Sequence, residues 1–223
     1  MLPREFRLRT RRAWFVCLLG ALCAFGVPGA RAQAQPAPAP AKADALQAPE
    51  HVIKKTVDVV FVILRDKVLA QDRQKRMQKL REAVDPAFDW EAMAQSSLGP
   101  PWRKLDEKQR ADFLGVFKEL LAQQYMDDID RFQGNEQVQI KGSEPSGELV
   151  NVKTLLITSS REQVPMNYTL QKEPKRWAVV DLSIEGVSLV NHYRQTFSRY
   201  LTNKSFPELM QQLKRKLGIH DGS

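Results

Sequence analysis

The hydrophobic period of the chain changes near Gly134, and this change constrains the fold more than any other feature of the sequence. Upstream of it, apolar residues recur at helical spacing in four successive segments. Residues 136–184 alternate instead between apolar and polar, which is typical of strands with one covered face. Helical spacing returns at about 188–201 and at 206–217. Helices, then strands, then helices predict an α+β domain.

Short turns divide the alternating region into four predicted strands. In the third predicted strand, the apolar residues from Val164 to Leu170 alternate strictly with polar ones. This pattern predicts that one face of the sheet is covered and the other is exposed to solvent. Connections this short favour an antiparallel meander. The sequence therefore predicts an antiparallel sheet of about four strands packed with helices, with strands at 136–142, 149–159, 163–172 and 176–184.

Capping residues mark where the predicted helices begin. Asp106 and Gln109 have the spacing of a capping box, and the longest apolar stripe follows them to about Phe132. Ser205 and Glu208 have the same spacing before the last helix. The other predicted helix starts are Pro49, Asp72, Asp89 and Ser188.

The first 32 residues have the anatomy of a secretory signal peptide. Five arginines precede an apolar run at 13–27, and the small-residue tripeptide Ala30-Arg31-Ala32 follows it. The run is too short to cross about 30 Å of hydrocarbon, so cleavage is favoured over membrane anchoring. We therefore expect export of the protein and a mature chain that begins at Gln33.

Removal of this leader changes what the composition implies. It takes six of the 34 basic residues and one of the 26 acidic residues, which leaves 28 and 25 and a net charge of +3. No dense basic stripe remains, which argues against nucleic acid as a partner. Both cysteines leave with it, so we expect no disulfide. We expect a disordered Ala/Pro-rich linker at 33–48, one domain at 49–218 and a disordered tail at 219–223.

Motifs for catalysis and metal binding are sparse. His51, His192 and His220 do not pair at metal-ligand spacing. The chain has neither a G-x-S-x-G nucleophile elbow nor a phosphate-binding P-loop. The acidic stretch MDDID at 126–130 lacks the glycine and spacing of a calcium loop and indicates a solvated helix end. We therefore expect no catalytic residue, no metal and no cofactor.

Asp181 stands among the apolar residues of the last predicted strand. A buried carboxylate must find a partner or be neutralised. Arg194 on the following helix, or a backbone N–H beside Gly186, can serve as that partner. Gly186 can adopt the backbone angles that the strand-to-helix corner requires, and Ser188 can cap the helix. We therefore expect structural roles for Asp181, Gly186, Ser188 and Arg194. The alternative is that Asp181 acts as a general base, as in ketosteroid-isomerase-like cone-shaped folds.

Two segments of the chain resemble a known family. The first, GPPWRKLDEKQRADFLGVFKELLAQQY at 99–125, has a Gly and a Trp followed by Gln-Arg, two Phe, Leu-Leu and Tyr. The second, WAVVDLSIEGVSLVNHYRQTF at 177–197, has Trp-x-Val-x-Asp, then Glu-Gly-Val-Ser-Leu, Tyr-Arg and Phe. Together they resemble the MlaC family, also called toluene-tolerance auxiliary proteins. The resemblance covers about residues 50–217.

This resemblance implies a fold and a function. The fold is NTF2-like or MlaC-like and encloses an apolar pocket. The function is that of a periplasmic lipid carrier, which shuttles phospholipid between an outer-membrane lipoprotein/porin complex and an inner-membrane ABC transporter complex with an MCE-type subunit. Such transport maintains the lipid asymmetry of the outer membrane. Family relatives beside hopanoid-synthesis genes leave the class of lipid open.

The surplus of apolar faces agrees with a carrier. Exposing about fifteen methylenes to water costs on the order of 12 kcal/mol per acyl chain, so a carrier must enclose them. The same apolar faces could instead pack against one another as a core. Two alternatives to the carrier therefore stand: a cone-fold enzyme that uses Asp181, and a periplasmic adaptor without a ligand. The residues expected to line a lipid pocket are Val57, Val60, Phe61, Phe113, Phe117, Leu121, Val152, Leu156, Met166, Tyr168, Leu170, Val180 and Leu182.

Overall fold

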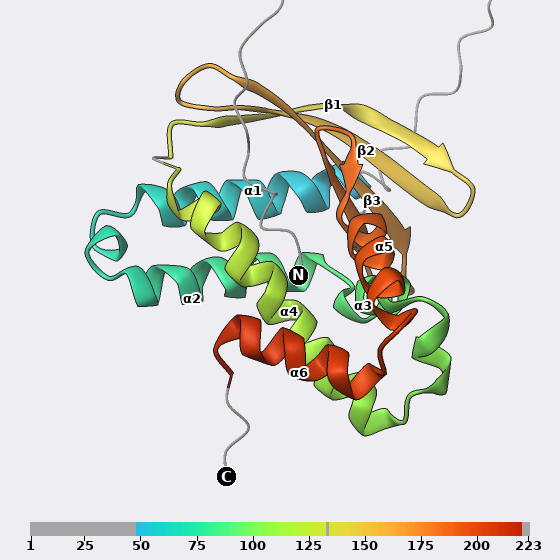
Figure 1. Cartoon of the computed structure of the whole chain (residues 1–223). Helices are drawn as coiled ribbons and strands as arrows, with labels where there is room; N and C mark the ends of the chain where they lie inside the picture. The colour runs from blue at the N-terminus through green and yellow to red at the C-terminus, as the bar shows by residue number, and fades with distance from the viewer. Residues whose placement is uncertain (1–47, 133, 220–223) are drawn as a thin grey trace, which may run out of the picture. The chain divides into compact units, whose positions relative to one another are not determined.

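The computed structural model describes residues 48–132 and 134–219. The predicted leader, almost all of the predicted linker and most of the predicted tail lie outside these described residues. Figure 1 shows the order of the elements along the chain. The described α-helices are α1 (Pro49–Arg65), α2 (Arg73–Val84), α3 (Trp90–Leu98), α4 (Glu107–Asp130), α5 (Leu189–Leu201) and α6 (Phe206–Leu217).

The helices begin where the capping residues predict. Both capping boxes form: the Asp106 side chain accepts from the Gln109 N–H at 2.8 Å, and Ser205 and Glu208 bond reciprocally at the start of α6. Local side-chain hydrogen bonds fix these boundaries, which is why the sequence reveals them. The first helix ends at Arg65, and Asp66 begins the turn that follows.

The strands form an antiparallel sheet in the order β1-β2-β3-β4-β5. The prediction of an α+β domain with an antiparallel meander is confirmed, and a two-residue strand extends the expected four. The strands are β1 (Gln137–Ser146), β2 (Leu149–Ile157), β3 (Gln163–Lys172), β4 (Trp177–Ile184) and β5 (Val187–Ser188).

A tight corner joins β4 to α5. Glu185 and Gly186 both take left-handed backbone angles, with φ of 51° and 82°. Glycine has no Cβ, so Gly186 adopts this positive φ without steric cost. Ser188 then caps α5 by accepting from the Asn191 N–H at 3.0 Å. The short β5 strand and the cap together direct α5 back toward the sheet.

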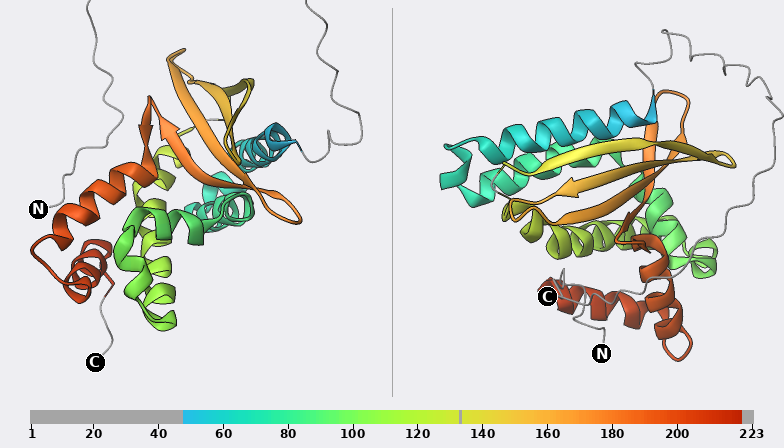
Figure 2. Two further views of the ribbon diagram at one scale, coloured as in Figure 1. Left: turned by 90° about the vertical axis from the view of Figure 1, so that its right-hand side faces the viewer. Right: turned by 90° about the horizontal axis from the view of Figure 1, so that it is seen from above.

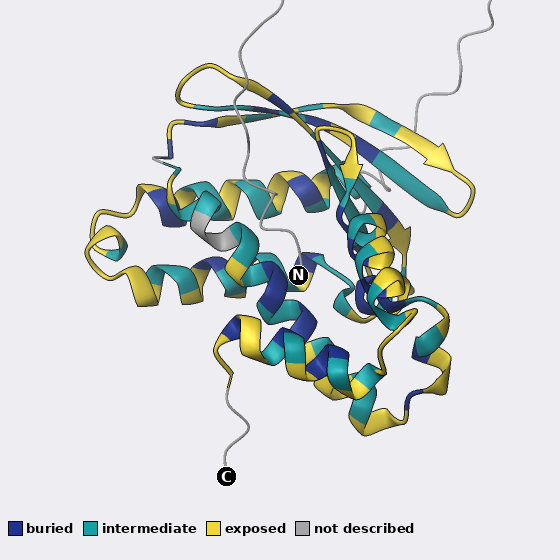
Figure 3. Cartoon of the chain, viewed as in Figure 1, coloured by how far each residue is buried: buried dark blue, intermediate teal, exposed yellow. Residues whose placement is uncertain are grey.

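The helices divide between two sides of the domain. Helix α1 runs along the sheet and contacts β1, β2 and β4, as the views in Figures 1 and 2 show. Helices α4, α5 and α6 pack on one another around Phe113, Phe117 and Phe197, which have no exposed surface. In Figure 3 the buried residues lie on the faces that these elements turn toward each other. The domain therefore has an aromatic helical core and a separate interface between α1 and the sheet.

Candidate functional site: an apolar cavity between the first helix and the sheet

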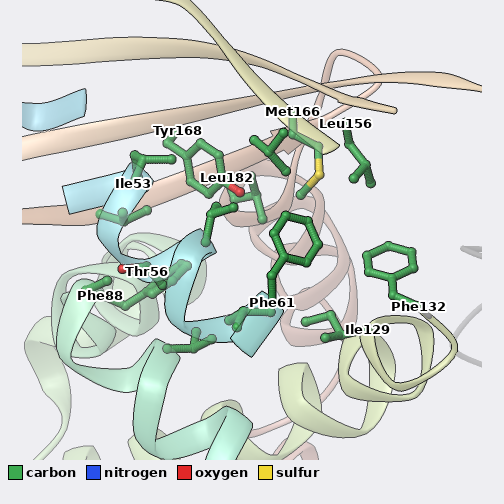
Figure 4. A pocket seen from close by; sticks show the side chains of 16 residues that line it. Ile53, Thr56, Phe61, Phe88, Ile129, Phe132, Leu156, Met166, Tyr168 and Leu182 are labelled. Atoms are coloured by element: carbon green, nitrogen blue, oxygen red, sulfur yellow. The ribbon is translucent and has the colours of Figure 1, made fainter. Parts of the chain in front are cut away.

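A cavity lies between α1 and the covered face of the sheet (Figure 4). The cavity volume is about 150 Å³, far above the roughly 10–15 Å³ that a cavity needs in order to hold one water molecule. Phe61 and Phe132 on the helical side face Met166 and Leu156 on the sheet side. The wall consists of Ile53, Thr56, Val57, Val60, Phe61, Val84, Ala87, Phe88, Ile129, Phe132, Val138, Leu156, Met166, Tyr168, Val179 and Leu182.

The cavity wall carries no charged side chain, and only two of its side chains have a polar atom. The Thr56 hydroxyl donates to the Val52 carbonyl of its own helix at 2.9 Å, so its hydrogen-bonding need is met locally. Burial raises the pKa of Tyr168 to about 12, so its phenol is neutral at physiological pH. The space is thus suited to hydrocarbon and unsuited to a charged ligand group.

Packed clusters close the sheet side of the cavity at both ends. At one end Val152, Leu170 and Val179 pack with Ile53 of α1. At the other end Leu156 packs with Val164 and Ile184. The covered face of β3 therefore has three parts: packed residues at Val164 and Leu170, and cavity-lining residues at Met166 and Tyr168 between them.

The structure brings together seven of the thirteen residues expected to line a pocket. These are Val57, Val60, Phe61, Leu156, Met166, Tyr168 and Leu182. The other six lie elsewhere: Phe113, Phe117, Leu121, Val152, Leu170 and Val180. Val152 and Leu170 are on the expected sheet face, but close packing against α1 leaves them without a free surface.

The three α4 residues lie outside this cavity wall because of the length of that helix. At 1.5 Å per residue its 24 residues span about 36 Å, so only its C-terminal end, at Ile129, reaches the cavity. Phe113 and Phe117 stack on each other with ring centroids 5.9 Å apart and belong to the helical core. Leu121 is also buried.

Val180 lies outside this cavity wall because of a β-bulge. The pairing of β3 with β4 shifts between Thr169 and Leu170, so Val180 is the extra residue on β4. A bulge breaks strict alternation, since two residues of one strand oppose one of its partner. Val179 and Leu182 therefore line the cavity, where a period of two had predicted Val180 and Leu182.

Nine cavity residues were not predicted. Ile53, Thr56 and Ile129 belong to helical apolar stripes, and the signal for them was present in the sequence. Val84, Ala87 and Phe88 come from the end of α2 and the short turn after it, which has no hydrophobic period. Phe88 forms a bridge to Val179, which places this turn against the sheet. The remaining three are Phe132, Val138 and Val179.

Asp181 does not belong to the cavity wall. Its Oδ1 accepts from the N–H groups of Leu182 at 2.8 Å and Val190 at 3.1 Å, and its Oδ2 accepts from the Ser188 hydroxyl at 2.5 Å. The carboxylate thus ties β4 to the start of α5. The backbone donors are Leu182 and Val190 rather than a neighbour of Gly186, and the other expected partner, Arg194, has its Nε beside Gly99.

Comparison with known proteins identifies the family. Residues 54–215 match the profile of the MlaC protein family. The chain belongs to the MlaC family. One solved structure similar to this MlaC-family chain is a phospholipid-binding protein from Ralstonia solanacearum in complex with a phospholipid. It is 22% identical and has a TM-score of 0.70 over 76% of this chain and 97% of that one. No curated protein gives a significant match.

The described part of this MlaC-family chain contains no helix long and apolar enough to cross a membrane. Among the side chains that the structure describes, no three His, Cys, Asp or Glu residues gather as a metal site would require.

Replacing Asp181 with Asn should lower the free energy of unfolding by about 1–3 kcal/mol, because a charged hydrogen-bond acceptor is lost from a partly buried site. Chemical denaturation measures this loss. A double-mutant cycle with Ser188→Ala should show coupling, since the two side chains bond directly. Lipid content should not change. Full stability together with loss of a measurable turnover would instead support the enzyme alternative.

Tyr168 should ionise only at strongly alkaline pH. Burial raises its pKa to about 12, whereas an unfolded tyrosine ionises near 10. The stability that the neutral phenol contributes is fully present below about pH 10 and is lost as pH rises toward 12. Ultraviolet titration of the wild type minus Tyr168→Phe should show a step near pH 12. A step near pH 10 would mean that this side chain is solvated.

Proposed function

We propose that this MlaC-family protein binds phospholipid and holds acyl chain in the cavity between α1 and the sheet. The observation that carries the proposal is an unfilled space whose sixteen lining residues include no charged side chain. Enclosing hydrocarbon there offsets a hydration cost of about 0.8 kcal/mol for every methylene. The phospholipid complex of the similar Ralstonia solanacearum protein supports the same class of ligand.

We further propose that the protein is a periplasmic carrier rather than an enzyme. Membership of the MlaC family supports transfer of phospholipid between an outer-membrane lipoprotein/porin complex and an inner-membrane ABC transporter complex with an MCE-type subunit. The position of Asp181 agrees with a binding role, since its carboxylate bonds to the start of α5 and is not part of the cavity wall. The Ala30-Arg31-Ala32 site supports export with cleavage before Gln33.

Extraction of lipid from the purified protein tests this function. The protein is isolated from a periplasmic fraction under mild conditions, its N-terminus is sequenced, and its organic extract is analysed by mass spectrometry. We expect an N-terminus at Gln33 and phospholipid in near-stoichiometric amount, with an unrelated periplasmic protein from the same cells as the control. A hopanoid in its place would change the ligand class. An empty protein would favour the ligand-free adaptor.

A further inference from the structure

The turn between α1 and α2 exposes apolar side chains. Val62, near the end of α1, is 68% exposed, and Val68 in the turn is 76% exposed. Val59, one helical turn before Val62, is also exposed. These three are a majority of the five large hydrophobic side chains exposed in the described part of the chain. Single exposed valines are ordinary, but a group at one helix end indicates a contact surface.

Positive charge accompanies these valines. Residues 62–76 hold five basic and two acidic residues, a net charge of +3. Both acids turn their carboxylates to the backbone: Asp66 accepts from the Val68 N–H at 2.8 Å, and Asp72 caps α2 by accepting from the Lys75 N–H at 2.9 Å. These two carboxylates therefore bond to the backbone rather than to the lysine side chains of the hairpin.

Some of the cations are neutralised and others are not. Asp130 of α4 pairs with Arg73 at 3.1 Å and with Arg76 at 2.5 Å. Lys67 and Lys75 are exposed, and neither forms an ion pair with any residue that the structure describes. Two ammonium groups that have no ion pair with a described residue thus lie at the same end of the α1–α2 hairpin as Val62 and Val68 (Figure 1).

We propose that Val62, Val68, Lys67 and Lys75 form a docking surface for an anionic bilayer. Protruding valines suit shallow insertion at the boundary between headgroups and acyl chains, while the ammonium groups are attracted to anionic lipid. An acidic protein would complement the lysines but would not account for two valines that project into solvent. The combination of apolar tips with unpaired cations fits a lipid surface.

This surface is continuous with the cavity through α1. The inner face of that helix contributes Val60 and Phe61 to the cavity wall, and Val62 follows on its exposed side. The Arg65 guanidinium lies 5.4 Å from the centre of the Phe61 ring. Docking through the hairpin end would therefore bring one wall of the cavity to the bilayer, although docking itself does not require that the cavity hold lipid.

Vesicle flotation tests the docking surface. The purified protein is mixed with phosphatidylcholine vesicles, or with vesicles in which about a third of the lipid is phosphatidylglycerol. We expect flotation only with the anionic vesicles, and weaker flotation at high salt because screening shortens the reach of the lysines. The double variant Lys67→Glu/Lys75→Glu should bind on the order of tenfold more weakly or worse. Val62→Ser/Val68→Ser should bind several-fold more weakly.

The matched control is Lys104→Glu/Lys175→Glu, which makes the same charge change at two exposed lysines outside the hairpin. It should float like the wild type. Equal loss in the control, no flotation of the wild type, or a valine variant that floats normally would each overturn the proposal. Unfolding curves verify that the variants fold. Extracted lipid is measured on the same samples, so loss of docking with normal cargo is distinguished from failure of the cavity to bind lipid.

Discussion

Leu156→Trp should greatly reduce the lipid recovered per folded molecule. Leu156 lies on β2 in the cavity wall and is 5% exposed. An indole that enters the cavity displaces roughly four methylenes of bound chain, which is about 3 kcal/mol or on the order of a hundredfold in affinity. Overpacking a filled core typically lowers the free energy of unfolding by about 1–3 kcal/mol. The loss here should be smaller, because free volume lies next to Leu156. Extraction with mass spectrometry and a denaturation curve measure the two quantities.

Leu170→Trp is the matched control for this substitution. Leu170 lies on the same sheet face, one strand over, but is fully buried against Ile53 and Val179. Overpacking there should cost at least about 1–3 kcal/mol of stability and leave lipid per folded molecule near the wild-type value. If Leu156→Trp destabilises the protein as Leu170→Trp does and keeps its lipid, this part of the sheet is packed core.

Phe117→Ala should cost about 3–5 kcal/mol of stability, the usual result of truncating a fully buried aromatic side chain. The Phe117 ring contacts Phe113, Tyr193 and Phe197, with centroids 5.9, 5.7 and 6.5 Å away, and has no exposed surface. Thermal or chemical unfolding gives the value. The recovered lipid should not change, because this ring lies outside the cavity wall.

Phe61→Ala makes the same truncation inside the cavity. Phe61 is only partly buried and already borders empty space, so its loss removes fewer packing contacts and should cost about 1–2 kcal/mol. Equal costs at the two positions would contradict the division into a filled helical core and an unfilled cavity. Loss of lipid from Phe117→Ala with Phe61→Ala unaffected would place the pocket against α4 and away from α1.

The elements of this fold could be predicted wherever local interactions determine them. The capping box at Asp106 and Gln109, the corner at Gly186 and the strict alternation of β3 each depend on residues a few positions apart. For the same reason the covered face of the sheet, with Met166 and Tyr168, was visible in the sequence. The helix-strand-helix order then determined the α+β class.

The extent of the cavity could not be predicted, because it depends on distances between elements. Nothing local to Phe113 reveals that its part of α4 packs on α5, whereas Ile129 on the same helix reaches the cavity. The bulge at Val180 is a matter of register between two strands, and it moved Val179 to the cavity side. A packed Leu170 and a cavity-lining Tyr168 likewise occupy the same alternating pattern.

Photo-crosslinking tests the central claim most directly. A phospholipid that carries a diazirine near the end of one acyl chain is loaded into the protein and irradiated, and the labelled residues are mapped by mass spectrometry. Binding in the cavity predicts labels on the inner face of α1, around Val57 and Phe61, and on β3 at Met166 and Tyr168. Labels confined to the α4–α5 aromatic core, or spread over the outer surface, would contradict it.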